Sequence, residues 1–269
     1  MSGDFSVDWL TLRTPADDRA RSTRLIETCA ARLACRAKDG PLTIADLGAG
    51  TGATWRALSP HLPRPQAWTL IDADTTLLDE AARRAEAAGN PDITVDTMTA
   101  DLMADPTPWR ETPDLVTASA LFDLTSRAFI EDFAAKLGAA RIPLLAMLTY
   151  DGRLELTPTH PDDAMMIDAF NTHQRSEKSF GRAAGPDGAG ILAEALAANG
   201  ARVEVDDTPW LLESDRGEAL MAATLEGWAD AARAILPGDG PRVDRWLAAR
   251  LADTRTLVVG HKDIFADYS

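Results

Sequence analysis

The chain has 269 residues, 45% of them hydrophobic and 26% charged, which is typical of a globular protein with a sizeable core. Its net charge of -15 argues against nucleic acid as a partner, because the phosphate backbone is also negative. Nowhere do eighteen apolar residues run together, and the first residues lack the pattern of a signal peptide. We therefore expect a cytoplasmic protein with no membrane partner.

The first predicted element is a helix over residues 15–37, where apolar residues recur at helical spacing. Cys29 and Cys35 lie inside it, with no histidine near them in sequence. This arrangement fits neither a disulfide scaffold nor a zinc site. We expect spectator thiols and no bound metal.

Strands and helices then alternate. Strands are predicted at "LTIADLG", "AWTLIDAD", "DITVDTMTADL", "PDLVTASAL" and "RIPLLAMLTY", and helices over residues 51–58, at "TLLDEAARRAEAAG" and at "SRAFIEDFAAKLGAA". The fifth strand is nearly all apolar, as expected for a parallel strand covered on both faces. Strands separated by helices of this length indicate βαβ units, so we predict an α/β fold with a doubly wound, mostly parallel, Rossmann-like sheet.

The alternation stops at residues 151–190, a polar stretch rich in glycine and proline with one helical segment around residues 161–173. We interpret it as an insertion after the fifth strand. A helix "ILAEALAANG", a strand "ARVEVDDTPWLL", helices around 215–235 and 241–252, and a closing strand "RTLVVGHKDIF" follow. One domain is expected, made of an N-terminal helical segment (1–40), a cofactor-binding half (41–150), the insertion (151–190) and the C-terminal half of the sheet (191–269).

Glycines 48, 50 and 52 directly follow the first predicted strand, in "IADLGAGTGA". The spacing also satisfies the dinucleotide pattern G-x-G-x-x-G/A, which is weak evidence by itself. Acids gather at the same edge of the sheet: Asp46 precedes the glycines, and Asp72 and Asp101 end the second and third strands. Carboxylates repel a pyrophosphate but suit S-adenosylmethionine, which carries a sulfonium, an ammonium group, a ribose diol and an adenine amine.

Through "IADLGAGTG", "LIDAD", "TADL" and "LVTASALFDL", in that order, residues 40–150 resemble the class I S-adenosylmethionine-dependent methyltransferases. The resemblance extends more loosely to a seven-stranded pattern that includes the closing strand. It implies that the methionine portion of the cofactor lies on the glycine loop, the ribose at the second strand, the adenine after the third, and the transferable methyl near the fourth. The residues implied for the methionine portion are Asp46, Gly48, Ala49, Gly50 and Gly52. Those for the ribose are Asp72 and Ala73, and those for the adenine are Asp101 and Leu102. Those near the methyl group are Ser119, Leu121 and Phe122.

Two further acids at strand ends have a simpler interpretation. Asp74 and Asp123 each precede a predicted helix. Since aspartate is a preferred N-cap residue, we expect both to cap these helices rather than to bind a ligand.

The acceptor pocket of this family is usually built from the N-terminal segment and from insertions after the fourth and fifth strands, which nominates residues 5–12, 119–124 and 151–190. "SALFDL" stands where nucleobase and glutamine N-methyltransferases carry an Asn/Asp-Pro-Pro-aromatic signature, so we expect a small-molecule acceptor. The polar stretch "NTHQRSEKSFG" suits an anionic acceptor such as a carboxylate, although a solvated loop with incidental charges explains it equally well.

The predicted insertion helix places Met166, Phe170 and His173 on one face. We expect Met166, Phe170, Gln174 and Arg175 to contact the acceptor, and His173 to orient or deprotonate it. Tyr150, at the end of the fifth strand, is a second catalytic candidate. A buried structural role for His173 is the competing interpretation. Of the remaining histidines, His61 is expected to lie at the surface, and His160 and His261 are expected to be structural.

The resulting hypothesis is a methyltransferase that releases S-adenosylhomocysteine. Three alternatives stay open: an aminopropyl or aminobutanoyl transferase on the same fold, a non-catalytic cofactor-binding partner subunit, and an NAD-dependent oxidoreductase. The sequence leaves the acceptor atom and the oligomeric state undetermined.

Overall fold

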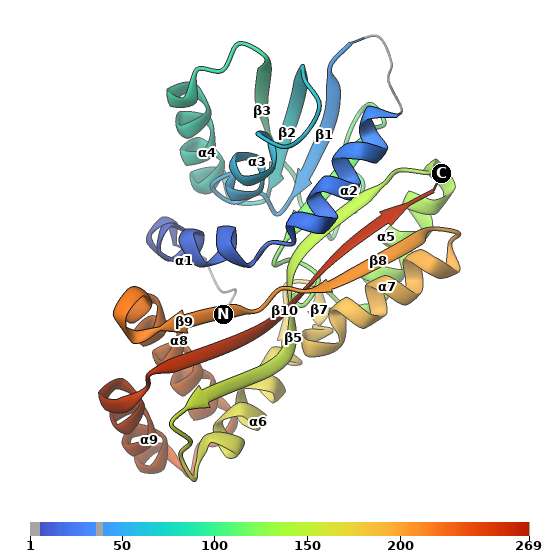
Figure 1. Cartoon of the computed structure of the whole chain (residues 1–269). Coiled ribbons are helices and arrows are strands. Elements are labelled where there is room, and N and C mark those ends of the chain that lie inside the picture. Colours follow the sequence, from blue (N-terminus) through green and yellow to red (C-terminus); the bar gives the residue numbers. More distant parts are fainter. Residues whose placement is uncertain (1–5, 36–39, 269) are drawn as a thin grey trace.

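The structure is a computed structural model that describes residues 6–35 and 40–268. Residue 5 of the nominated acceptor segment and the last two residues of the predicted helix 15–37 lie outside these ranges. The described part folds around one twisted sheet with helices on both faces (Figure 1).

The main sheet has the strand order β3-β2-β1-β4-β5-β10-β8, with β9 paired to β10. The first five strands in this order are parallel, and β10 runs antiparallel to both of its long neighbours. This confirms the predicted doubly wound, mostly parallel sheet. The strands are β1 (Leu42–Leu47), β2 (Gln66–Asp72), β3 (Ile93–Thr99), β4 (Leu115–Ser119), β5 (Leu144–Thr157), β8 (Arg202–Asp207), β9 (Trp210–Glu213) and β10 (Thr256–Asp267).

Helices cover both faces of this sheet. In chain order they are α1 (Val7–Ala20), α2 (Thr23–Ala34), α3 (Ala53–Leu58), α4 (Thr75–Ala88), α5 (Arg127–Ala140), α6 (Asp163–Gln174), α7 (Gly188–Ala198), α8 (Ser214–Ile235) and α9 (Gly240–Asp253). Apolar side chains of α2, α3 and α4 pack on one face, and those of α5 and α7 on the other. A short hairpin of β6 (Glu177–Lys178) and β7 (Gly181–Arg182) and a 3-10 turn η1 (Gly185–Asp187) follow α6.

The predicted N-terminal helix is two helices that meet at Arg21. The Ser22 hydroxyl accepts a hydrogen bond from the backbone N–H of Leu25 over 3.0 Å and so caps α2. Serine is a favoured N-cap residue because its side chain satisfies a backbone donor that the new helix leaves free. The break turns the chain, and Arg21 becomes a buried residue at the corner.

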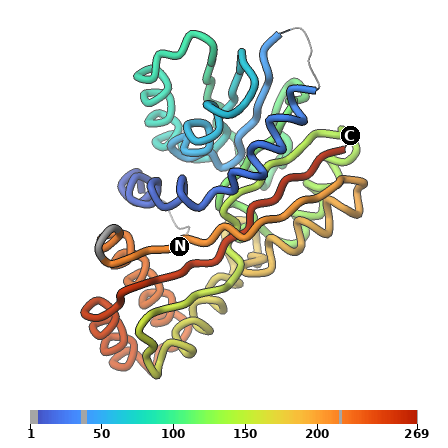
Figure 2. Tube along the Cα trace, viewed as in Figure 1, coloured from blue at the N-terminus to red at the C-terminus, as the bar shows by residue number. Residues whose placement is uncertain are grey.

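The fifth strand does not end at Tyr150, as the sequence analysis expected, but continues to Thr157. Leu154 and Leu156 are buried while their neighbours are exposed, the alternation of a half-buried strand. This extension pairs with the first half of β10, and Figure 2 traces the two strands side by side. The predicted strand 201–212 is likewise split into β8 and β9.

The extended ends of β5 and β10, together with β9, support a second hydrophobic cluster with α6, α8 and α9. The helices that contribute to it lie at the lower end of Figure 1. Within the segment 151–190, the end of β5 and α6 build this cluster, and the β6–β7 hairpin and η1 follow them.

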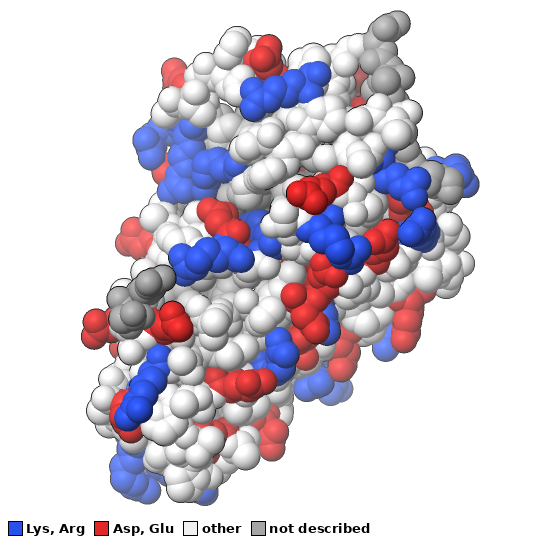
Figure 3. Space-filling view, in the orientation of Figure 1, with Lys and Arg blue, Asp and Glu red and all other residues white. Residues whose placement is uncertain are grey.

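Figure 3 shows acidic and basic side chains interspersed over the face that it views. Over residues 6–35 and 40–268, no helix has the length and apolar character needed to cross a membrane. The same residues contain no cluster of three or more His, Cys, Asp or Glu side chains that could hold a metal ion.

Candidate cofactor and acceptor site

The loop between β1 and α3 requires its glycines. Gly48, Gly50 and Gly52 have φ angles of +60°, +52° and +76°, a left-handed region that other residues rarely adopt. A Cβ on Gly48 would lie 3.3 Å from the side chain of Leu121, and one on Gly50 would lie 3.2 Å from that of Leu10. The loop is therefore approached closely from the end of β4 and from α1, with Ala49 buried between.

Asp72 lies beside this loop, at the end of β2. One carboxylate oxygen accepts from the backbone N–H of Gly50 over 2.8 Å, and the other from that of Asp74 over 3.0 Å. The side chain is half-buried, and Ala73 next to it is exposed. Asp74 caps α4, as predicted, by accepting from the backbone N–H of Thr76 over 2.8 Å.

Asp101 and Leu102 follow β3 on the same edge of the sheet. Asp101 is exposed, and its carboxylate accepts from the backbone N–H of Met103 over 2.9 Å. Leu102 is buried. Asp46, Asp72 and Asp101 thus lie at the carboxyl ends of three neighbouring strands, which is where α/β sheets bind ligands.

Asp46 carries an orphan atom, by which we mean a buried side-chain nitrogen or oxygen for which residues 6–35 and 40–268 supply no hydrogen-bond partner. One of its oxygens accepts from the Thr117 hydroxyl over 2.7 Å, and the other, Oδ2, is an orphan atom. Burial raises the pKa of this carboxyl to about 7. A cation placed against Oδ2 would stabilise the charged form.

Arg21 is a site residue that the sequence analysis missed. It is 6% exposed, and Nη1 donates to the Ser119 hydroxyl over 3.3 Å and approaches the Met147 sulfur at 3.4 Å. Its Nε and Nη2 are orphan atoms; Nε lies 3.8 Å from the Asp18 carboxylate, too far for a hydrogen bond. The Arg21 charge opposes the rise in the Asp46 pKa. The serine after it was the available signal, since a serine N-cap marks a helix start.

The residues at the end of β4 and just after it lie in two different environments. Ser119 contacts Arg21, and Leu121 reaches the glycine loop at Gly48. Phe122 instead points into the core beneath α5, where its ring lies 5.6 Å from that of Phe133. The structure thus brings Leu121 to the glycine loop and Ser119 to Arg21, while Phe122 belongs to the core.

Asp123 does not cap α5, contrary to the sequence prediction. The cap is Ser126, whose hydroxyl accepts from the backbone N–H of Phe129 over 3.2 Å. Asp123 is 8% exposed, and its Oδ1 is an orphan atom. Burial raises the pKa of this carboxyl to about 6.

The apolar face predicted on α6 is core rather than a ligand surface. Met166 is fully buried in the second hydrophobic cluster. Phe170 lies edge-on to Tyr150, with 5.6 Å between ring centroids, and 5.5 Å from Trp228 of α8. The Tyr150 hydroxyl donates to Asn171 over 2.7 Å, and burial raises its pKa, so this phenol keeps its proton.

His173 ends α6 in a different environment. It is half-buried, its Nδ1 is an orphan atom, and burial together with the Lys178 charge lowers its pKa, so the imidazole is neutral near pH 7. Arg175 pairs with Asp187 at 3.1 Å. Gln174 is half-buried, with its backbone against Gly185.

The other histidines differ in setting. His61 is exposed, and His160 accepts from the backbone N–H of Asp162 through Nδ1 over 3.1 Å. His261 is buried against Trp210 and Tyr150, and burial lowers its pKa to about 3. Its Nδ1 is also an orphan atom.

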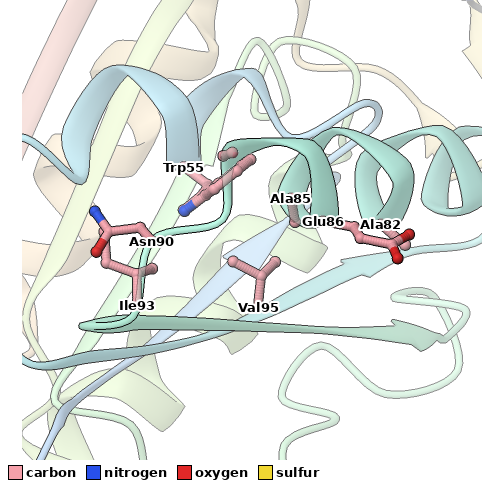
Figure 4. A pocket seen from close by; sticks show the side chains of 8 residues that line it. Trp55, Ala82, Ala85, Glu86, Asn90, Ile93 and Val95 are labelled. Carbon is pink, nitrogen blue, oxygen red and sulfur yellow. The ribbon is translucent and has the colours of Figure 1, made fainter.

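Two surface hollows are described, and neither contains the glycine loop. One, of about 240 Å³, lies between α3, α4 and the start of β3, the end opposite Asp101 (Figure 4). Its lining residues are Trp55, Ala82, Ala85, Glu86, Ala88, Asn90, Ile93 and Val95. The other, of about 250 Å³, adjoins Arg21 from the side of α2 and α3. Because ligand-fitting groups gather at the loop, we place the site there and not in the first hollow.

Residues 44–140 match a family model described as a methyltransferase domain. This segment contains the glycine loop and the three acids at the strand ends. Over residues 44–140 the chain is therefore similar to methyltransferase domains. The cofactor of this family is S-adenosylmethionine, and no curated protein matches the sequence.

Solved structures share the methyltransferase fold along nearly the whole chain. A cyclopropane-fatty-acyl-phospholipid synthase-like protein from Lactobacillus casei has a TM-score of 0.59 at 15% identity and covers 97% of this chain and 93% of its own. A cyclopropane synthase from Mycobacterium tuberculosis has a TM-score of 0.54 at 15% identity and covers 99% of this chain and 95% of its own. A protein from Bacillus halodurans described as a methyltransferase has a TM-score of 0.52 at 13% identity and covers 90% of this chain and 99% of its own. At such identities the likeness establishes the fold.

Proposed function

We propose that the protein transfers the methyl group of S-adenosylmethionine to a small-molecule acceptor. The observation that carries the acceptor class is the burial of polar groups beside the end of β4. Asp123 Oδ1 and His173 Nδ1 are orphan atoms, and η1 and the start of α7 pack against the turn that carries Asp123. A small molecule can reach groups buried in this way more readily than a protein or a nucleic acid can.

The residues of the glycine loop fit the cofactor. The left-handed glycines let a ligand lie on the backbone, and the Asp46 and Arg21 orphan atoms offer an acceptor and a donor of opposite charge. These charges match the ammonium and carboxylate groups of the methionine portion. Asp72 keeps lone pairs for the ribose hydroxyls, because each carboxylate oxygen can accept more than one hydrogen bond.

When bound, S-adenosylmethionine supplies an electrophilic methyl carbon. The protein's contribution is to position the acceptor and to exclude water, and positioning can account for much of the rate of such a transfer. We assign His173 to the acceptor as an orienting group. The charge of Lys178, which acts on both Asp123 and His173, favours an acceptor with an anionic group.

The proposal is tested in two steps. Calorimetry with S-adenosylhomocysteine should give binding at micromolar or tighter concentrations, and wild-type protein without measurable binding would refute it. Incubation with S-adenosylmethionine and a panel of hydroxybenzoates, phenols, amino acids and amines is then followed by mass spectrometry. S-adenosylhomocysteine as the nucleoside product supports methyl transfer, whereas methylthioadenosine would indicate an aminopropyl-type or aminobutanoyl-type reaction.

A further inference from the structure

Asp123 differs from Asp263 in its hydrogen bonding and shares with Asp46 a buried oxygen that is an orphan atom. Asp263 accepts from the backbone N–H groups of Ser22 and Leu148 and from the Thr208 hydroxyl, at 2.7 to 2.9 Å. Backbone hydrogen bonds from Asp123 itself and from Tyr150 lower the pKa of the Asp123 carboxyl, but its Oδ1 is an orphan atom at 8% exposure. Leaving a buried carboxylate oxygen without a donor costs free energy, so its retention calls for a reason.

The backbone holds Asp123 in this position. Its carbonyl accepts from the N–H of Gly185 over 2.9 Å, and the carbonyl of Thr125 accepts from the N–H of Ala184 over 2.7 Å. A Cβ on Gly188 would lie 3.1 Å from the Asp123 Cα, so η1 and the start of α7 pack tightly against this turn. Asp123 therefore cannot turn outward to solvent without moving these segments.

Charged groups face Asp123 from three elements. Arg13 of α1 and Lys178 of β6 lower its pKa, opposing the effect of burial. Arg13 is already bound to Asp17 at 2.9 and 3.1 Å, so it is engaged elsewhere. The Asp123 charge in turn contributes to the raised pKa of Tyr150 of β5. The half-buried Lys178 ammonium is thus the cation that we assign to Asp123.

We propose that Asp123 is a catalytic residue that accepts a proton from the methyl acceptor, which is therefore a molecule with an O–H or N–H nucleophile. This inference rests on the proposed function. As the acceptor atom bonds to the methyl carbon, the carbon–sulfur bond breaks and its electron pair stays on sulfur. The acceptor proton passes to Oδ1 of Asp123. Lys178 is a positioning residue that keeps the carboxyl ionised until the proton arrives.

Position in the chain supports the assignment. Asp123 is two residues beyond Leu121, whose side chain contacts Gly48 of the cofactor loop. The Lys178 charge acts on both His173 and Asp123. The proton acceptor thus follows, at the carboxyl end of β4, the residue that lies against the cofactor loop.

The first test uses Asp123→Asn and needs no acceptor. The pKa of Asp123 is raised to about 6, above the ordinary value of about 3.9. Ionisation of this carboxyl therefore destabilises the folded protein, and stability falls as the pH rises from about 4 to about 6. Asparagine cannot ionise, so Asp123→Asn should melt at a higher temperature than wild type at about pH 8 and at the same temperature near pH 4. The matched control, Asp163→Asn, should melt lower than wild type at about pH 8, because it leaves Arg250 buried without its anion.

The second test separates catalysis from cofactor binding. The affinity of Asp123→Asn for S-adenosylhomocysteine should lie within a few-fold of the wild-type value. Its rate of methyl transfer, followed as formation of S-adenosylhomocysteine, should be lower by about 10²-fold or more. If Asp123→Asn does not melt at a higher temperature than wild type at pH 8, the Asp123 carboxylate has a partner. If the variant keeps full turnover, Asp123 takes no part in the reaction. Either result overturns the inference. Failure of the wild type to bind S-adenosylhomocysteine would instead refute the proposed function.

Discussion

The backbone N–H of Gly50 donates to the carboxylate of Asp72 over 2.8 Å. This bond joins the loop after β1 to the end of β2, and a second bond from the Asp74 N–H fixes the other carboxylate oxygen. The carboxylate is therefore oriented by the protein itself before any ligand binds. Preorganisation of this kind reduces the ordering that a ligand must otherwise impose.

Asp72→Ala should weaken binding of S-adenosylhomocysteine by about 1.5 to 3 kcal/mol, because the ribose hydroxyls lose a charged acceptor. Isothermal calorimetry on folded protein measures this directly. Asp74→Ala is the matched control, since Asp74 caps α4 and should cost about 1 kcal/mol of stability without changing affinity. Equal affinity in wild type and Asp72→Ala would remove this acid from the site.

Gly50→Val should abolish measurable cofactor binding. The residue has φ +52°, and a side chain there would meet Leu10 at 3.2 Å and cover the surface on which a ligand would lie. Gly89→Val provides the comparison, because Gly89 has φ +55° but its Cβ would meet nothing closer than 3.9 Å. Both variants should lose stability, and only Gly50→Val should lose affinity. Retained affinity would mean that the loop serves only as a turn.

The cofactor half of the fold follows from local sequence signals. The glycine loop after an apolar strand, the Asp74 cap and the left-handed Gly89 at the end of α4 all act over a few residues, and the structure has each of them. Parallel strands then bring Asp46, Asp72 and Asp101 to one edge. Local chemistry and a single topology rule were sufficient here.

The acceptor half depends on contacts between distant segments. β5 continues past Tyr150 because β10, about a hundred residues later, pairs with it, and a polar stretch alone does not reveal that partner. Helical periodicity predicted that Met166 and Phe170 share a face, but α8 decides that this face is core. The sequence predicted Asp123 as the cap of α5, but η1 and α7 pack against Asp123 and Ser126 caps the helix.

The affinity for S-adenosylhomocysteine should fall as pH drops below about 7. Burial raises the pKa of Asp46 to about 7, so the carboxyl becomes neutral below this pH and no longer attracts the ligand's ammonium group. The expected loss approaches tenfold per pH unit between about pH 7 and pH 5. Methylthioadenosine lacks the ammonium group, so its affinity should not show this dependence. A flat profile for both ligands would place Asp46 away from the amino group.

Arg21→Gln should selectively weaken ligands that carry the methionine carboxylate. Its Nε and Nη2 are orphan atoms, and we expect them to donate to that carboxylate. Loss of a charged hydrogen bond of this kind costs about 1.5 to 3 kcal/mol. The affinity of S-adenosylhomocysteine should fall by that amount, while that of methylthioadenosine stays within a few-fold. A parallel fall for both ligands would indicate that Arg21 only supports the loop by compensating the buried Asp46 charge.

His173→Ala should lower turnover while leaving the affinity for S-adenosylhomocysteine within a few-fold of wild type. The imidazole is neutral near pH 7, and its Nδ1 is an orphan atom beside the interior that Asp123 and Lys178 share, so it is available to a ligand. An orienting group acts on the acceptor and not on the cofactor, and we expect a fall of about 10²-fold.

His160→Ala is the matched control for this last prediction. His160 is also half-buried, but its Nδ1 already accepts from the backbone N–H of Asp162 at the start of α6. Its loss should therefore lower the melting temperature and leave turnover per folded molecule unchanged. Steady-state rates and thermal melts on the two variants separate the roles. If His173→Ala behaves as His160→Ala does, His173 is a structural residue, and the acceptor is positioned by Asp123 and Lys178 without it.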